Sequence, residues 1–563
     1  MNTETKNCQN CKKDFRIEPE DFDFYTEIHV PPPTWCPQCR LIRRFSWQGY
    51  RVLYKRKCDF SGEVVVSAHH PNSRHPVYRQ DIWWSDKWDP KTYGQEYDFS
   101  RPFFEQYINL IAKVPLPSLY TAYSTMVNSD YCNAASGLKD CYLCFRITGG
   151  EDSAYLNTIV DARNSLDTSF SNHIELCYGS VRLNQCYQAF FSRNCEGCQN
   201  ILFSRDLVGC SYCIGCINLR SKQYHIFNKP YSKEEYENFV KTLDLGTPSA
   251  LAIFQKKVDD FIVMQPRKQF SGRKNTDVSS EYISNSKNVK NSYMLNNGED
   301  LRYCQFLKDG PAAKAYDYSF FGDGAEWIYE CCWTGLGANN NKFGSWNYGA
   351  HDIEYCFGCH NSGNLFGCVG IRKGEYCILN KQYSKSEYQE LLFKIKKHMS
   401  DLPYRDPAGH IYRYGEMFPS EISPWAYNDS TAHDFFPLTK EEALAEGFRW
   451  RDPDQKEYGP ATIEVPDHIK DVIDDILKGI LKCGDCGRNY QIISMELEFY
   501  RKMNIPIPRQ CPLCRDRARI KLLNPIKIYI RTCAKCGKQI ETSYAPDRPE
   551  IVYCEACYQN EVA

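Results

Sequence analysis

The sequence predicts a mainly β fold in which cysteine-rich modules at both ends flank a two-half, β-solenoid-like centre with helical caps. Three observations support this fold class. A cysteine pattern near the N-terminus recurs near the C-terminus without a gap. The centre contains short, strand-sized runs at a nearly constant spacing. A block that ends in a helix signal also occurs twice within that centre.

The terminal cysteine pattern reads C-x2-C-x24-C-x2-C in both copies, starting at Cys8 and at Cys483. The same ungapped alignment also matches apolar, proline and arginine positions. The matched residues are Cys8, Cys11, Ile17, Phe24, Tyr25, Pro31, Pro33, Cys36, Pro37, Cys39, Arg40 and Arg44, which align in that order with Cys483, Cys486, Ile492, Phe499, Tyr500, Pro506, Pro508, Cys511, Pro512, Cys514, Arg515 and Arg519. The chain therefore contains an internal duplication whose fixed points are cysteines.

These cysteines have the spacing of metal ligands. A C-x2-C pair directs both sulfurs at one ion when the chain turns between them, and two pairs complete a tetrahedral zinc–thiolate site. The predicted ligand sets are Cys8, Cys11, Cys36 and Cys39; Cys483, Cys486, Cys511 and Cys514; and Cys533, Cys536, Cys554 and Cys557. We expect three structural zinc ions, each supplying about 10–16 kcal/mol of apparent folding free energy. Buried free cysteine is the alternative, which six such pairs disfavour.

The third ligand set lies in "RTCAKCGKQIETSYAPDRPEIVYCEACY". This segment resembles the small bacterial CxxC-x17-CxxC zinc-ribbon domain, and the whole chain resembles uncharacterised bacterial multi-zinc-ribbon proteins. Neither resemblance implies an established activity. Gly487 and Gly537 follow the first cysteine pair of the second and third sets, where a positive φ is often needed.

Composition limits the class of protein. The chain has 563 residues, which predicts three or more domains, and a net charge of -1, so attraction to nucleic acid must come from local clusters. We see no apolar run near the ~18 residues of a membrane span. The N-terminal "MNTETKNCQNC" has no apolar signal region, so we expect a cytoplasmic location. Thirty cysteines in a reducing compartment favour metal binding and burial over disulfides.

A second duplication lies in the centre. The block that starts at Gly215 aligns without gaps with the block that starts at Gly367. Each block predicts a strand, a turn and then an amphipathic helix with a serine N-cap and a glutamate three residues later, Ser232 with Glu235 and Ser384 with Glu387. The insert 247–266 predicts a further helix. The helices after Ser232 and Ser384 would cap the exposed edges of the two halves, and the insert helix would separate the halves.

Short strand-like pieces precede each of these blocks. Cys144, Ser165 and Cys186 are evenly spaced, twenty-one positions apart, and so are Leu156, Cys177, Cys198 and Leu219. A period of about 20 predicts a β-solenoid, whose coils stack to bury their faces. The stretch from 279 to 380 has a similar texture and weaker periodicity.

Other cysteines lie outside the three ligand sets, and we predict packing for most of them. In an extended strand, residues i and i+3 face opposite sides, so C-x2-C in the centre would not chelate a metal. Cys210 with Cys213 and Cys216 is the best exception. Cys58 with His69, His70 and His75 is a further candidate. Both groups stay open on the sequence alone.

Basic residues follow both duplicated cysteine patterns, in "RLIRRFSWQGYRVLYKRK" and "RDRARIKLLNPIKIYIR". Cations beside aromatic rings suit phosphate contacts and base stacking. We therefore expect salt-sensitive binding of RNA or DNA, with the contacts made by Arg40, Arg43, Arg44, Arg515, Arg517 and Arg519. The alternative is a strand pair with solvated charges and inward aromatic rings.

No catalytic residue is predicted, because we find no phosphate-binding loop, nucleophile elbow or catalytic thiol motif. The sequence therefore favours a non-enzymatic zinc-binding protein, associated with nucleic acid or the ribosome, that carries its ribbons on a β-solenoid scaffold. The alternatives are a protein-interaction scaffold and an enzyme with a site in the solenoid groove.

The predicted domains follow from these signals. They are an N-terminal zinc ribbon (1–57), an aromatic-rich connector (58–125), solenoid half 1 with its cap (126–246), a helical linker (247–278), solenoid half 2 with its cap (279–400), a linker (401–465), the duplicated zinc ribbon (466–528) and the CxxC-x17-CxxC ribbon (529–563).

Overall fold

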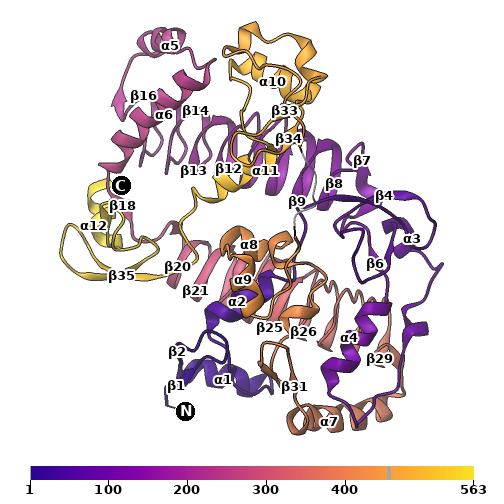
Figure 1. The fold of residues 1–563 in the computed structure, drawn as a ribbon. Coiled ribbons are helices and arrows are strands. Elements are labelled where there is room, and N and C mark those ends of the chain that lie inside the picture. Colours follow the sequence, from indigo (N-terminus) through magenta and orange to yellow (C-terminus); the bar gives the residue numbers. More distant parts are fainter. Residues whose placement is uncertain (1, 453–457, 563) are drawn as a thin grey trace. The chain divides into compact units, whose positions relative to one another are not determined.

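The computed structural model describes residues 2–452 and 458–562, so part of the expected 401–465 linker lies outside the described residues. The fold is mainly β (Figure 1). The chain forms two compact units. Unit 1 contains Met1–Leu119, Phe270–Asp452 and Ile526–Ile528, and unit 2 contains Tyr120–Gln269, Pro453–Pro525 and Tyr529–Ala563. Each unit thus combines one half of the strand-rich centre with segments from the ends of the chain.

The centre of unit 2 is a sheet of short parallel strands, which we call stack 1; its strands are the purple to magenta rungs of Figure 1. They are β7 (Met126–Val127), β8 (Asn133–Tyr142), β9 (Phe145–Ala154), β10 (Asn157–Arg163), β11 (Ser169–Glu175), β12 (Val181–Phe190), β13 (Arg193–Glu196), β14 (Gln199–Leu202), β15 (Ser211–Ile214), β16 (Gln223–Ile226) and β17 (Lys229–Pro230). Ser169 pairs with Asn157 before it and with Val181 after it, so the register steps by twelve positions in each direction. Twelve residues therefore make one coil.

Each coil of stack 1 turns four times, because the backbone takes a positive φ at every third residue. This series runs without a gap from Ala134 (φ 52°) to Phe227 (φ 46°). A left-handed backbone costs about 1–2 kcal/mol for most residues and less for Gly, Asn and Asp. Many of the corners are Gly, Asn or Asp, and the parallel hydrogen-bond ladders hold the others in place.

From Ala135 to Cys216 the residue after each corner is buried in the core of stack 1, except Gly150, so core positions also recur every three residues. Cys195 and Cys198 are two consecutive core positions, both about 1% exposed. The expectation that residues i and i+3 of such pairs face opposite sides is therefore wrong, because a corner lies between them. Their assignment to packing still agrees with the structure, since they belong to none of the candidate metal-binding groups among the described residues.

The predicted period of about 20 is also wrong, because consecutive strands of stack 1 are shifted by twelve positions. Cys144, Ser165 and Cys186 are all core positions, which recur every three residues. Twenty-one is a multiple of three but not of twelve. Residues twenty-one positions apart are therefore all core positions, but they do not lie at equivalent places in successive coils.

Serine and cysteine suit this core because they pair backbone groups that the ladders leave free. Ser192 Oγ donates to the Phe190 carbonyl (2.9 Å) and accepts from the Ser204 N–H (3.1 Å) one coil later. Cys198 Sγ accepts in the same way from the Cys210 N–H (3.4 Å). A buried N–H without an acceptor costs about 1–3 kcal/mol. The core therefore favours side chains that are both small and able to accept.

Unit 1 contains a related sheet, which we call stack 2. Its strands are β19 (Gly272–Arg273), β20 (Thr276–Ser284), β21 (Lys287–Asn296), β22 (Gly298–Arg302), β23 (Gln305–Asp309), β24 (Ala312–Gly322), β25 (Ala325–Thr334), β26 (Asn339–Lys342), β27 (His351–Glu354), β28 (Gly363–Phe366), β29 (Glu375–Ile378) and β30 (Lys381–Gln382). The register shift between paired strands is less regular in stack 2 than in stack 1. Val278 pairs with Val289, one position short of a twelve-residue coil, whereas Gly298 pairs with Ala312, two positions beyond one.

The predicted cap helices are confirmed. Helix α5 (Lys233–Thr242) follows stack 1 and helix α7 (Lys385–Asp401) follows stack 2, each with the serine–glutamate capping box. The insert 247–266 forms helix α6 (Pro248–Val263), as predicted. Where each stack ends, an asparagine side chain pairs with the last coil: Asn228 with both backbone groups of Ile217, and Asn380 with those of Val369.

Shorter elements complete the units. They include α4 (Phe103–Lys113), β6 (Leu116–Pro117), β31 (Tyr404–Arg405), β32 (Ile411–Tyr412), α8 (Thr431–Phe435) and α9 (Lys440–Ala445) in unit 1, and β18 (Arg267–Lys268) in unit 2. Among the described residues, none of the helices combines the length and apolarity needed to cross a lipid bilayer.

The hydrogen-bond role of core serines can be tested at Ser192. Ser192→Ala removes the acceptor of the Ser204 N–H, so we expect that amide to exchange with solvent about 10–100-fold faster, corresponding to about 1–3 kcal/mol. Hydrogen exchange measures this directly. Ser192→Cys keeps an acceptor and is the matched control. Equal exchange rates in wild type and Ser192→Ala would contradict the role.

Candidate metal centres and their docking contacts

The first ribbon brings its four cysteines together through a strand hairpin and a helix start. Strands β1 (Glu4–Asn7) and β2 (Asp14–Ile17) flank Cys8 and Cys11, and helix α1 (Pro19–Glu27) follows them. Cys36 precedes helix α2 (Pro37–Phe45), and its N–H donates to Cys8 Sγ at 3.2 Å. Lys12 supplies the left-handed residue of the turn, with a φ of 59°.

The second ribbon repeats this geometry. Strands β33 (Leu481–Lys482) and β34 (Asn489–Tyr490) precede helices α10 (Ser494–Met503) and α11 (Pro512–Ile520). The Cys511 N–H donates to Cys483 Sγ at 3.2 Å, as in the first copy. Burial raises the pKa of the Cys483 thiol, but backbone N–H donors outweigh burial and lower it to about 7. Gly487 takes the expected positive φ of 70°.

The third ribbon is a smaller version without the intervening helix. It contains β35 (Tyr529–Thr532), β36 (Gln539–Thr542), β37 (Val552–Tyr553) and α12 (Glu555–Val562). The Cys554 N–H donates to Cys533 Sγ at 3.2 Å, and Gly537 has the expected positive φ of 73°. Although burial opposes the shift, backbone N–H donors lower the pKa of Cys533 to about 6.

Each predicted cysteine set forms a group that could hold a metal ion, with all four sulfurs within 4.8 Å of one another. The distance from Cys11 Sγ to Cys36 Sγ is 3.8 Å, and that from Cys486 Sγ to Cys511 Sγ is also 3.8 Å. Metals bind the thiolate form. The pKa is lowered at Cys483 and Cys533, whereas it is raised to about 11 at Cys511 and to about 12 at Cys557, so the grouping of the sulfurs is the evidence for a metal site.

The arginines that follow the first ribbon's cysteines contact stack 2. Arg40 Nη2 lies 2.7 Å from Asp317 Oδ2, and Arg44 Nη1 lies 2.7 Å from Asp317 Oδ1, so the two guanidinium groups share one carboxylate. The side chains of these three residues are at most 2% exposed. Asp317 lies at a left-handed corner of the stack (φ 54°).

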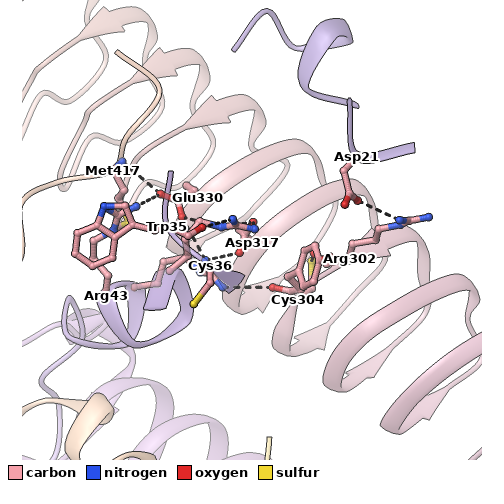
Figure 2. A network of polar contacts seen from close by, with 12 residues as sticks. Asp21, Trp35, Cys36, Arg43, Arg302, Cys304, Asp317, Glu330 and Met417 are labelled. Carbon is pink, nitrogen blue, oxygen red and sulfur yellow. Dashed lines mark hydrogen bonds and ion pairs between the residues drawn. The ribbon is translucent and has the colours of Figure 1, made fainter. Parts of the chain in front are cut away.

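A second carboxylate extends this buried network. Figure 2 shows Arg43 beside Trp35 and Glu330, with its Nη2 2.6 Å from Glu330 Oε2. The Arg43 guanidinium lies 4.4 Å from the centre of the Trp35 ring, and Glu416 adds a carboxylate 3.4 Å away. Burial raises the pKa of Glu330, although the nearby Arg43 opposes this shift.

The second ribbon contacts stack 1 through the same set of groups. Arg519 Nη1 lies 2.6 Å from Asp167 Oδ1, and Arg515 Nε lies 3.2 Å from Asp167 Oδ2. Arg519 Nε donates to Ser169 Oγ at 2.9 Å. In the first copy, Arg44 Nε donates to Ser319 Oγ at 3.2 Å. The duplication therefore includes the docking contact as well as the cysteines.

These contacts correct the expectation for five of the six candidate phosphate-binding residues. Arg40, Arg43, Arg44, Arg515 and Arg519 are 0–8% exposed and lie in ion pairs with carboxylates, so phosphate cannot reach them in the folded units. Arg517 is half-buried.

Sequence reasoning did not find the carboxylates of the docking contact. The signal was present, because Asp167 and Asp317 each begin the pattern D-x-S-F, in "DTSF" and "DYSF". The pattern places the carboxylate at a corner and the serine two residues later, where both meet the arginine of a ribbon.

The histidines near Cys58 do not join it in a metal-binding group among the described residues. His75 Nδ1 lies 2.8 Å from the Ile111 carbonyl, and burial lowers the pKa of His75 to about 3. His69 is also buried, and burial lowers its pKa as well. These histidines therefore serve the packing of unit 1.

Two open clefts lie on unit 2. One of about 550 Å³ lies beside the second ribbon and is lined by Tyr142, Leu477, Asn489, Tyr490 and Ile493, among others. The other, of about 390 Å³, lies on stack 1 and contains Asp161, His173 and Glu175. His173 Nδ1 lies 3.4 Å from Asp161 Oδ2, but both side chains are 54% exposed, so water solvates this pair.

Comparisons with known proteins do not assign a family. No protein-family model and no curated protein matches the chain. A solved structure described as a "putative acetyltransferase from Desulfovibrio desulfuricans G20" shares 10% sequence identity, with 50% of this chain and 84% of that chain covered and a TM-score of 0.10. A likeness this weak carries no argument about fold or function.

The docking contact can be tested at Asp317. Asp317→Asn removes the charge that Arg40 and Arg44 share, and an uncompensated buried charge costs about 3–5 kcal/mol. We expect a lower unfolding temperature and faster hydrogen exchange in helix α2. Glu151→Gln, which breaks the exposed pair with Lys139, is the control and should change little. Unchanged exchange in α2 would contradict the contact.

Proposed function

We propose that this protein is a non-enzymatic zinc-binding scaffold for protein interactions, in which each of two β-solenoid stacks has one zinc ribbon docked on it. The observation that carries the proposal is the duplicated docking contact. In each ribbon, two arginines form ion pairs with a single aspartate of the stack in the same unit, so they are not available to an external ligand.

Zinc fits the three cysteine groups by geometry and chemistry. A tetrahedral ion with Zn–S bonds of about 2.3 Å places sulfurs about 3.8 Å apart, which agrees with the 3.8 Å between Cys11 Sγ and Cys36 Sγ. Four thiolates fill the coordination sphere, so no position remains for water or substrate. This supports a structural role for the metal.

The two stacks support the scaffold part of the proposal. The constant twelve-position shift in stack 1, with an unbroken series of corners, is typical of a solenoid whose coils contact only their neighbours. Such stacks present long outer surfaces. The half-apolar cleft beside the second ribbon, with Leu477 and Ile493, adds a surface suited to a protein segment.

The chain has thirty cysteines, and twelve of them lie in the three groups that could hold metal, which supports a reducing compartment; we propose the cytoplasm. We also propose that the third ribbon is a small bacterial zinc ribbon. Its C-x2-C-x17-C-x2-C spacing and the grouping of its four cysteines support this.

Zinc content tests the role of the metal. Elemental analysis of the purified protein should find three zinc ions per chain, and Cys511→Ser should leave two. The same change should speed hydrogen exchange in helix α11 and leave the strands of stack 1 protected, because each ribbon depends on its own metal. Cys210→Ser, at a core position of stack 1, is the control and should retain three. Fewer than two zinc ions in wild type would contradict the proposal.

A salt series separates the scaffold from a nucleic-acid binder. Fluorescence titration with single-stranded RNA and with duplex DNA should show no binding whose affinity falls steeply as salt increases, because five of the six candidate arginines are already paired. Steep salt dependence would indicate several phosphate contacts and would favour the nucleic-acid alternative.

A further inference from the structure

A hairpin in unit 1 has the backbone geometry of a ribbon's first cysteine pair. Strands β3 (Tyr54–Lys57) and β4 (Val64–Ser67) flank Cys58. The Cys58 N–H donates to the Glu63 carbonyl (2.8 Å), and the Gly62 N–H donates to the Cys58 carbonyl (2.9 Å). In the third ribbon the Cys533 N–H donates to Lys538 (2.8 Å) and the Gly537 N–H to Cys533 (3.0 Å).

The segment that follows matches the ribbon's second cysteine pair. The Arg79 N–H donates to Cys58 Sγ at 3.2 Å, the same distance at which the Cys554 N–H donates to Cys533 Sγ. Arg79 is also the N-cap of the short helix α3 (Gln80–Trp83), just as Cys36 and Cys511 are N-caps of helices α2 and α11. Arg79 therefore stands where a ribbon has its third cysteine.

The sequences confirm the correspondence without a gap. The offset from Cys58 to Cys533 equals the offset from Cys8 to Cys483. Identical residues at this offset are Tyr54, Arg56, Cys58, Gly62, Pro71, Val77 and Tyr78, which align with Tyr529, Arg531, Cys533, Gly537, Pro546, Val552 and Tyr553. The terminal duplication therefore continues from the first ribbon into residues 54–83.

The surroundings correspond as well. Strand β5 (Val77–Tyr78) pairs in parallel with β6, and β37 of the third ribbon pairs in parallel with β18. Arg56 Nη1 donates to the His70 carbonyl at 3.1 Å, and Arg531 Nη1 donates to the Ala545 carbonyl at 3.2 Å.

Three of the four metal ligands are replaced in this copy. Ser61, Arg79 and Ile82 stand at the positions of Cys536, Cys554 and Cys557. One thiol does not make a tetrahedral thiolate site. Arg79 instead forms ion pairs with Glu63 and with Asp81 (2.6 Å). Ile82, only 3% exposed, puts an apolar side chain in place of a sulfur.

We propose that residues 54–83 are a fourth ribbon, the duplicate of the third, that folds without a metal. Its hairpin and helix are held by the buried Ile82 and by the β5–β6 pairing. The comparison rests on the proposed function in one respect, namely that the third ribbon binds zinc. The two units then differ in metal dependence: the third ribbon holds β18 through zinc, whereas the fourth holds β6 without it.

Restoring the ligands tests the geometry. The triple variant S61C/R79C/I82C should bind four zinc ions per chain instead of three, by elemental analysis. The double variant R79C/I82C has only three thiols at this site and is the matched control. Its fourth zinc ion should be bound more weakly than that of the triple variant and should transfer faster to a chromogenic chelator. A folded triple variant that still holds three zinc ions would overturn the proposal.

Hydrogen exchange on the wild-type protein gives a second readout if the triple variant does not fold. After zinc removal with EDTA, amides of β37 should exchange more than tenfold faster, while those of β5 keep their protection. Cys36→Ser, which disrupts only the first ribbon's metal site, should also leave β5 protected. Loss of protection in β5 together with β37 would overturn the proposal. If Cys554→Ser leaves the zinc content unchanged, zinc binding by the third ribbon fails instead, and the triple variant alone decides the fourth.

Discussion

A left-handed backbone turn at every third residue is the constraint on which the rest of this structure depends. It divides each coil of stack 1 into four short sides and leaves one core position on each side. The buried core cluster of stack 1 consists of Leu, Ile, Ala and Cys without aromatic residues, and the close coils require acceptors for backbone N–H groups that the ladders leave free. Serine and cysteine provide these acceptors, as Ser192 and Cys198 show. The same corners also place Asp167 and Asp317 where the ribbons contact the stacks.

The contact between a ribbon and a stack therefore occurs twice in the chain, once within each unit. Within each unit, two arginines one helical turn apart bind one corner aspartate, and the second of them binds the serine two residues after it. A buried charge cluster of this kind is demanding in geometry, because any missing partner leaves an unpaired charge. It favours a single placement of each ribbon on its stack. The partner stack is not the one nearest in sequence, so this contact forms only after most of the chain is present.

Much of this fold could be predicted from local signals. The cysteine spacing identified the three groups that could hold metal among the described residues, and the serine–glutamate pairs identified helices α5 and α7. These features follow from short-range chemistry. The coil length could not be found in the same way, because a core that repeats every three residues produces matches at many spacings. Many corners with a positive φ, such as Leu143 and Tyr155, are also not Gly, Asn or Asp, so residue type does not mark them all.

The arginines show a second limit. In sequence, Arg40 and Arg515 sit in basic, aromatic segments that suit phosphate contact equally well. Only the position of Asp317 and Asp167, each in a distant part of the chain, decides that they are buried. Likewise, a serine, an arginine and an isoleucine replace three cysteines in the proposed fourth ribbon, so the cysteine spacing does not reveal it, although other residues around Cys58 match the third ribbon.

A chain wound in coils of twelve residues has a natural unit of length. Within a stack, each strand pairs with the strand of the coil before it and of the coil after it, so a whole coil can be gained or lost while the remaining coils keep the same pairing register. An insertion shorter than a coil makes one coil longer than twelve residues. Stack 2 contains such a coil, because Gly298 pairs with Ala312, two positions beyond a twelve-residue shift. The centre of this protein can thus vary in length during evolution while its ribbons remain attached at the same corners.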